Sequence, residues 1–317
     1  MGEPKSDLTT NPGISPEPPS SPAPPSLDRV HTVFLGPEGL RPGWGVFLYL
    51  GMSAALFFIL VGLNRLVASR SAGFLWAQLV TNVVLVIASL VPAVVMGAIE
   101  KRPFAAYGLP PQNAFGKHFW IGVVWGMGML SVLMLAMRGL GVFSFGHLAL
   151  HGIRIFKFAA FWGVLFLLVG FFEEFAFRGY TLHNLSRAIG FWPAAWVFSI
   201  IFGALHLANQ GEAWLGGLAA GVIGLFFCFT LRRTGSLWFA VGMHASWDWG
   251  ESYLYSVPDS GGVVTGHLLN SSVHGSHWLT GGSVGPEGSL LVFVVVGLAW
   301  VVFDRMYLAR PAGETEN

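Results

Sequence analysis

Long apolar stretches alternate with short polar segments through most of this 317-residue chain. A helix crosses the hydrocarbon core of a bilayer with about 20 residues, so each stretch of that order is a candidate membrane span. The pattern predicts an all-α fold, a polytopic membrane bundle of about eight helices, with seven as the alternative because the last two candidates are weaker. The candidate spans are 44–68, 74–99, 119–137, 158–177, 191–208, 214–231, 237–253 and 290–303.

Composition agrees with a protein whose main solvent is lipid. Charged residues make up 10% of the chain and hydrophobic residues 54%, whereas soluble domains carry about 25% charged residues. The formal net charge of +1 gives no basis for nucleic-acid binding. The single cysteine, Cys228, lies in an apolar run and cannot form an intrachain disulfide, so we interpret it as a small buried hydrophobic residue.

The two ends of the chain differ from its centre. Residues 1–42 are polar and rich in proline, and such a segment cannot bury a core. We therefore expect a disordered cytoplasmic tail over 1–42 that acts as a tether, a transmembrane bundle over 43–309, and a short C-terminal tail over 310–317.

Basic residues predict the orientation, because Lys and Arg concentrate in cytoplasmic loops. Eight spans place both termini on one side, which predicts that both are cytoplasmic, and we expect the bacterial inner (plasma) membrane. Twelve basic residues lie on that side, namely Lys5, Arg29, Arg41, Lys101, Arg102, Lys117, Arg178, Arg187, Arg232, Arg233, Arg305 and Arg310. Five lie on the other, namely Arg65, Arg70, Arg138, Arg154 and Lys157.

The 254–289 loop contains no Lys or Arg, which favours the outer side of the membrane. Its glycines and serines are typical of a mobile loop. Its three histidines, His267, His274 and His277, could bind a metal, although solvated histidines are commoner in loops.

Two adjacent glutamates follow the apolar run of the fourth candidate span. Glu174 and Arg178 are four residues apart, on one helix face and in the order that favours an ion pair. Glu173 points about 100° away from Glu174. One carboxylate can thus be neutralised by Arg178 while the other faces a cavity, where it could serve as a general base. A plain buried ion pair would explain Glu174 and Arg178 but not the second glutamate.

Two further spans carry ionisable residues, which are costly in a membrane and tend to mark functional sites. His206 follows Phe202 by four residues in the fifth span, and His244 precedes Asp248 by four in the seventh, which also holds Glu251. Hydrogen-bonded packing could explain either histidine alone. Three helices with such groups favour a site that activates water. The chain has no His-Glu-x-x-His zinc helix, no Gly-rich phosphate loop and no serine or cysteine in a recognised nucleophile setting.

Taken together, these motifs resemble the CAAX-protease and bacteriocin-processing (CPBP) family of intramembrane glutamic endopeptidases. The family pattern is Glu-Glu-x-x-x-Arg, Phe-x-x-x-His and His-x-x-x-Asn or Asp on successive membrane helices. These motifs stand here in that order, and the resemblance covers about 158–249. They are Glu173-Glu174-x-x-x-Arg178, Phe202-x-x-x-His206 and His244-x-x-x-Asp248.

The resemblance implies a peptidase in which Glu173 and His206 activate the attacking water and Glu174 and Arg178 support them. His244 and the residue at 248 would stabilise the oxyanion. Asp248 replaces the commoner asparagine, and it could donate a hydrogen bond only when protonated. No cofactor is expected. Zinc held by Glu173, His206, His244 and Asp248 is the alternative.

The implied substrates are membrane-associated peptides or proteins, and nothing in the sequence requires a prenyl group. A non-catalytic protein on the same fold, such as a bacteriocin self-immunity factor, is the competing interpretation, and a transporter is a further one. One geometric difficulty concerns depth, because Glu173 counts out near the cytoplasmic end of its span and His206 nearer the far end. Helix tilt, or a helix running on past Arg178 toward His183, would bring them level.

Overall fold

The computed structural model describes residues 2, 33–36, 39–67, 73–209, 211 and 213–307. Met1–Arg41 and Pro42–Asn317 are separate units. In the first, strands β1 (Leu35–Gly36) and β2 (Gly39–Leu40) pair antiparallel. Most of the predicted 1–42 tail and all of the predicted 310–317 tail lie outside the described residues.

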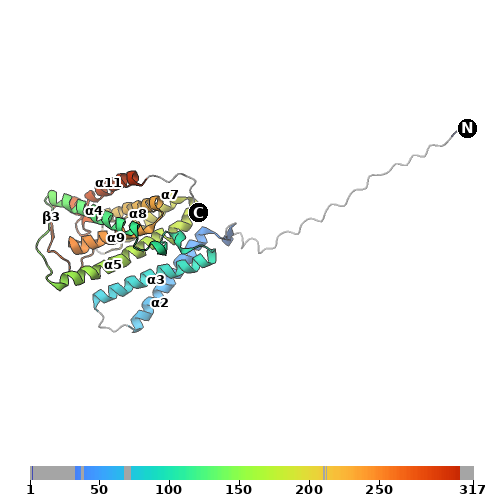
Figure 1. Cartoon of the computed structure of the whole chain (residues 1–317), viewed down its shortest axis with the longest axis horizontal. Helices are drawn as coiled ribbons and strands as arrows, with labels where there is room; N and C mark the ends of the chain where they lie inside the picture. Colours follow the sequence, from blue (N-terminus) through green and yellow to red (C-terminus); the bar gives the residue numbers. More distant parts are fainter. Residues whose placement is uncertain are drawn as a thin grey trace. The chain divides into compact units, whose positions relative to one another are not determined.

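The second unit is an all-α membrane bundle, as predicted, and a helix occupies each of the eight predicted spans (Figure 1). The seventh span ends early as an α-helix and continues as a π-helical turn, Gly250–Leu254. The amphipathic helix α6 is additional. The helices are α2 (Pro42–Val67), α3 (Phe74–Glu100), α4 (Lys117–Gly139), α5 (Ile153–Arg178), α6 (Tyr180–Ile189), α7 (Phe191–His206), α8 (Trp214–Thr234), α9 (Leu237–Trp249), α10 (His277–Thr280) and α11 (Leu290–Met306).

Five segments are long and apolar enough to cross a membrane by themselves. Helices α7, α9 and α11 are shorter, with 16, 13 and 17 residues. Two of these shorter helices, α7 and α9, carry His206, His244 and Asp248 of the site described below. The five segments are Pro42–Arg65, Phe74–Glu100, Lys117–Gly139, Ile153–Ile189 and Trp214–Thr234.

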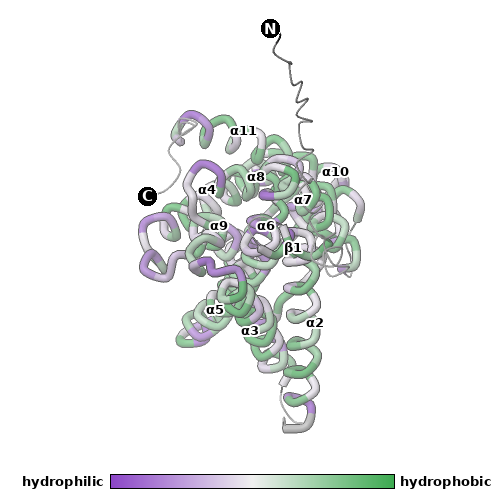
Figure 2. The backbone as a smooth tube through the Cα atoms, turned by 90° about the vertical axis from the view of Figure 1, so that its right-hand side faces the viewer, coloured by the Kyte–Doolittle hydropathy of each residue, from purple (hydrophilic) through white to green (hydrophobic). Residues whose placement is uncertain are grey.

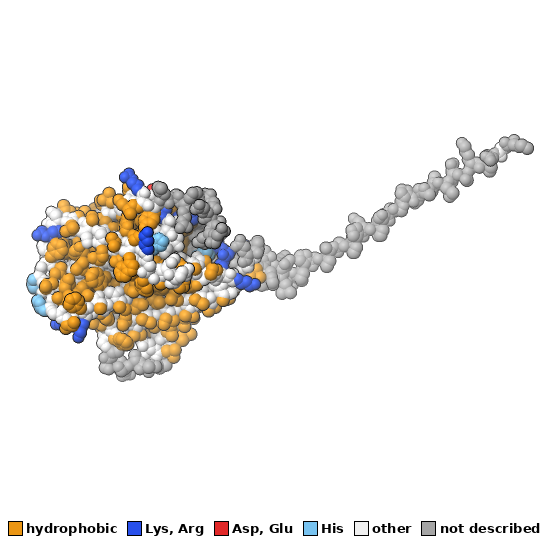
Figure 3. Space-filling view, in the orientation of Figure 1, with side chains coloured by type: hydrophobic (Ala, Val, Ile, Leu, Met, Phe, Trp, Pro, Cys, Tyr) orange, Lys and Arg blue, Asp and Glu red, His pale blue; other side chains and the backbone are white. Residues whose placement is uncertain are grey.

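The outer surface of the bundle is apolar, which indicates contact with lipid. Large hydrophobic side chains face outward on several helices, and Phe58, Val124 and Ile200 are 70%, 70% and 63% exposed. Hydrophobic side chains cover much of the face shown in Figure 3, and the helices in Figure 2 are hydrophobic along most of their length. Soluble monomers rarely expose apolar area on this scale.

Glycines let the central helix α9 approach its neighbours closely. A Cβ on Gly122 of α4 would collide with the backbone oxygen of Phe239, and one on Gly242 of α9 would collide with that of Phe119. The Ser246 hydroxyl donates to the Val123 carbonyl oxygen at 3.1 Å across the same contact. In lipid the hydrophobic effect does not drive helices together, so membrane helices associate through close packing at small residues of this kind.

The 254–289 loop has more structure than its glycines and serines suggested. Its strand β4 (Ser272–Val273) pairs with β3 (Phe143–Ser144), and Leu269 bridges Leu148. The segment also contains α10 and the 3₁₀ turn η4 (Pro286–Gly288). Pairing with 143–148 satisfies backbone groups that would otherwise need water, so the loop is held to the segment that precedes α5.

Candidate active site

A cavity of about 610 Å³ lies among the helices of the second unit. Four of the residues singled out from the sequence line it together, namely Glu173, His206, His244 and Asp248. Its apolar lining comes mainly from α5, α8 and α9 and includes Leu165, Phe166, Val169, Phe226, Phe227, Met243 and Trp247. The cavity therefore combines an apolar wall with a small group of ionisable side chains.

The predicted ion pair on α5 is present and buried. Arg178 Nη1 donates to Glu174 Oε1 at 2.9 Å. Glu174 is 0% exposed and Arg178 is 2% exposed. Arg178 is therefore buried in the bundle and is not one of the loop cations with which it was counted to predict the orientation. Helix α5 ends at Arg178, and the Thr181 hydroxyl donates to the Ala176 carbonyl oxygen at 2.7 Å, which satisfies part of the helix end.

The Arg178 guanidinium is fixed from several directions. It lies 4.6 Å from the ring centroid of Phe202 and 5.4 Å from that of Phe227. Its Nε donates to the Gly224 carbonyl oxygen at 3.2 Å. A Cβ on Gly224 would lie 2.7 Å from Arg178 Nη2, so a glycine is needed where α8 passes this side chain. Arg178 thereby holds Glu174 in one position.

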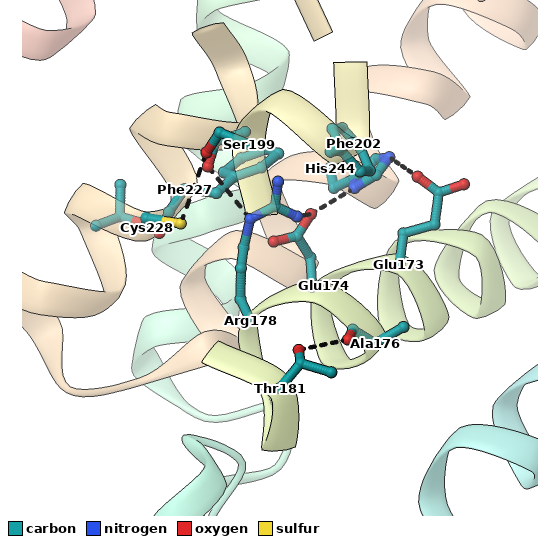
Figure 4. A network of polar contacts seen from close by, with 12 residues as sticks. Glu173, Glu174, Ala176, Arg178, Thr181, Ser199, Phe202, Phe227, Cys228 and His244 are labelled. Atoms are coloured by element: carbon teal, nitrogen blue, oxygen red, sulfur yellow. Dashed lines mark hydrogen bonds and ion pairs between the residues drawn. The ribbon is translucent and has the colours of Figure 1, made fainter. Parts of the chain in front are cut away.

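The imidazole of His244 is surrounded by three carboxylates. Its Nδ1 lies 2.9 Å from Glu174 Oε1, and its Nε2 lies 3.4 Å from Asp248 Oδ2 and 3.8 Å from Glu173 Oε2. The ring stacks on Phe227 with centroids 5.7 Å apart. Figure 4 shows Glu174 between Arg178 and His244, with Glu173 on the other side of the imidazole. Both ring nitrogens face acceptors, which suits an imidazolium that donates from both.

His206 is the last residue of α7 and is held by its own helix. Its Nδ1 lies 2.8 Å from the Phe202 carbonyl oxygen. A carbonyl oxygen can only accept, so Nδ1 carries a proton and Nε2 of the neutral ring is left as an acceptor. The His206 ring also packs on that of Phe202, with centroids 4.4 Å apart. The Phe-x-x-x-His motif therefore fixes one tautomer of the histidine.

Glu173 and His206 lie at a similar depth, because both side chains line the same cavity. Helix α6 follows α5 after the single residue Gly179 and packs against both α5 and α7. A helix that runs on past Arg178 toward His183 was one of the two arrangements expected from the sequence.

A second acidic group adjoins the histidine site. One ligand oxygen from each of Asp248, Asp259 and Glu287 lies within 4.8 Å of the others. Burial raises the pKa of the Asp259 carboxyl well above its ordinary value, and the Glu287 and Asp248 carboxylates raise it further. Among the described residues, this is the set whose geometry could hold a metal, rather than the set considered for zinc, which shares only Asp248 with it.

Sequence reasoning missed several lining residues. Gln78 and Asn82 of α3 line the cavity, and their polar side chains, four residues apart in an apolar span, were a usable signal. Asp259 and Glu287 are 28 positions apart in a loop without periodicity, so no spacing rule could find them. The loop histidines His267, His274 and His277 form no metal-ligand group in the part of the chain that the structure describes.

A comparison with known proteins matches the segment of the chain that carries most of this site. Residues 155–250 match the family model described as type II CAAX prenyl endopeptidase Rce1-like. That segment contains all six ionisable residues of the three motifs. No curated protein and no solved structure matches the chain.

Proposed function

We propose that this chain, whose residues 155–250 match the Rce1-like CAAX-protease family model, hydrolyses peptide bonds of membrane-associated peptides or proteins with a water molecule that Glu173 and His206 activate. The observation that carries the proposal is that these two side chains, from α5 and α7, line one cavity with His244 and Asp248.

Glu173 is the base in this mechanism. Its neighbour Glu174 is committed to Arg178 and His244, whereas the half-buried carboxylate of Glu173 makes, among the described residues, only the longer contact to His244 at 3.8 Å. It can accept a proton as water attacks the scissile carbonyl carbon. His206 Nε2, left as an acceptor by the bond from Nδ1, receives a hydrogen bond from the same water and orients it.

The oxyanion of the tetrahedral intermediate needs a donor that is already in place. His244 supplies it from Nε2–H, while Glu174 fixes the ring through Nδ1 and Arg178 fixes Glu174. Asp248 lies on the Nε2 side and orients the imidazole. The tetrahedral intermediate then collapses with cleavage of the C–N bond, and Glu173 gives the proton that it took from water to the leaving amine nitrogen. The products are a carboxylic acid and an amine, and Glu173 is again a carboxylate.

The alternative of an immunity factor on the same fold does not account for a base and an aligned histidine at one cavity, since a scaffold requires neither. The apolar wall favours substrates with hydrophobic side chains or a lipid group near the scissile bond. The site imposes no requirement for a prenyl group.

Cleavage by the purified protein in detergent tests this function. A library of hydrophobic peptides, with and without a C-terminal prenyl group, is incubated with the wild-type protein, and products are identified by mass spectrometry. We expect cleavage that a zinc-selective chelator does not abolish. Absence of cleavage across both libraries would favour a non-catalytic role, and loss with the zinc chelator would favour a zinc mechanism.

A further inference from the structure

Four acidic side chains from three segments of the chain converge beside the histidine site. Asp248 lies on α9, Glu251 on the following π-helical turn, Asp259 at the start of the 254–289 loop, and Glu287 on η4 near its end. Oxygens of Asp248, Asp259 and Glu287 lie within 4.8 Å of one another. Like charges at this separation repel unless a cation or protons neutralise them.

Glu251 gives an independent indication of a ligand. It is 0% exposed, and its Oε2 accepts a hydrogen bond from Trp247 Nε1 at 2.7 Å. Its Oε1 has no hydrogen-bond partner among the described residues, although the carboxylate lies within electrostatic reach of the other three acids. A buried carboxylate oxygen without a partner is costly, and a cation beside it would remove that cost.

Among the residues that the structure describes, the one positive charge near the four acids is the imidazolium of His244, 3.4 Å from Asp248. Glu173 and Glu174 share it. The 254–289 loop has no Lys or Arg, and no Lys or Arg of the described part of the chain is seen in an ion pair with the four acids. Serine hydroxyls approach two of them, Ser252 to Asp259 at 3.0 Å and Ser260 to Glu287 at 2.9 Å. These are neutral donors that orient the carboxylates without cancelling their charge.

We propose that Asp248, Asp259 and Glu287, with Glu251 behind them, bind a calcium ion that fastens the 254–289 loop to α9. All the offered ligands are carboxylate oxygens, the donors that hard cations prefer, whereas zinc sites usually include nitrogen or sulfur. Calcium–oxygen distances of 2.3–2.6 Å allow two ligand oxygens of one ion to lie up to about 5 Å apart, so oxygens within 4.8 Å of one another can share such an ion.

The ion shapes one wall of the cavity and takes no part in water activation. Asp259, Glu287 and the loop segment 260–263 line the cavity together with Glu173. Fastening this loop keeps the wall in place while substrate binds. Loss of the ion therefore raises KM more than it lowers kcat.

Terbium luminescence measures the site without reference to proteolysis. Tb³⁺ substitutes for Ca²⁺, and the indole of Trp247, bonded to Glu251, lies close enough to sensitise its emission. The purified protein in a non-ionic detergent is titrated with Tb³⁺ and then with Ca²⁺. We expect saturable emission that Ca²⁺ reverses, and loss of that emission in the double variant Asp259→Asn/Glu287→Gln. Emission that is absent in the wild type or unchanged in the double variant would overturn the proposal.

Thermal unfolding provides a second measurement. The wild-type melting temperature should fall on addition of EGTA and recover with Ca²⁺, whereas the double variant should respond to neither because its repelling charges are gone. Asp304→Asn, an exposed acid on α11 outside the cluster, is the matched control and should respond as the wild type. A wild type indifferent to Ca²⁺ would indicate that the acids share protons and would refute the site.

Glu173→Gln separates this proposal from the proposed function. The variant should lose proteolysis and keep Ca²⁺-reversible Tb³⁺ emission, because Glu173 is not among the ligands. Loss of proteolysis with no calcium response in any form of the protein would refute only the calcium site. Calcium binding without proteolysis in the wild type would refute only the enzyme.

Discussion

The Nδ1 atom of His244 lies 2.9 Å from Oε1 of Glu174, the same oxygen that accepts a hydrogen bond from Arg178 at 2.9 Å. One carboxylate oxygen thus joins α9 to the end of α5. The second glutamate of the Glu-Glu motif therefore holds the imidazole through its Nδ1, and in the proposed mechanism it is a positioning residue while Glu173 is the base.

Replacing Glu174 should destabilise the protein as well as inactivate it. Glu174→Gln leaves the buried Arg178 without its counter-charge, and breaking a buried ion pair costs about 3–5 kcal/mol. Expression in the membrane and thermal unfolding in detergent should both decline, together with peptide cleavage.

The double variant Glu174→Gln/Arg178→Met is the control for that prediction. It removes both charges, so it should be more stable than Glu174→Gln alone although still inactive. A double variant no more stable than the single one would show that the ion pair is not what Glu174 contributes.

Gly224 should be sensitive to the smallest side chain. The Cβ of Gly224→Ala would press on Arg178 Nη2 and on the Phe202 ring, and overpacking of this kind costs about 1–3 kcal/mol. Cleavage should fall because Arg178 can no longer hold Glu174. Gly297→Ala on α11 is the matched control, since nothing lies within 4 Å of its Cβ. Equal activity of the two variants would contradict the assigned role of Arg178.

The orientation in the membrane remains a prediction from the basic residues. Reporter fusions at residue 42 and at the C-terminus should both report the cytoplasm, and an insertion near Val263, an exposed residue of the 254–289 loop, should report the opposite side. A non-cytoplasmic signal from either terminal fusion would require a different number of spans.

Helical spacing explains why much of the site was predictable from the sequence. Residues four apart share a helix face, so the Glu174–Arg178 pair and the approach of His244 to Asp248 follow from local sequence. Ionisable residues in the fourth, fifth and seventh predicted spans predicted one shared cavity, and the apolar pattern predicted the helices that carry them.

Contacts that depend on how helices are set against one another were not predictable in the same way. The bond between His244 and Glu174 requires α9 to lie close against α5, which Gly170 allows because a Cβ there would be 3.3 Å from that of His244. The positions of Asp259 and Glu287 depend on the course of a long loop, for which a single sequence has no periodic signal. Asp248 belongs both to the histidine site and to the acidic group with Asp259 and Glu287. This double membership was not predictable from the sequence for the same reason.

The rate of peptide cleavage by Glu173→Gln, measured against the wild type under identical conditions, tests the central claim most directly. The substitution preserves the shape of the side chain and removes the base, and Glu173 takes no part in the buried Glu174–Arg178 pair, so the melting temperature should be nearly unchanged. Since general base catalysis contributes about 10²–10⁴-fold, we predict a decrease in rate of at least about 10²-fold. Cleavage of the same bond by the folded variant at the wild-type rate would contradict the glutamate mechanism.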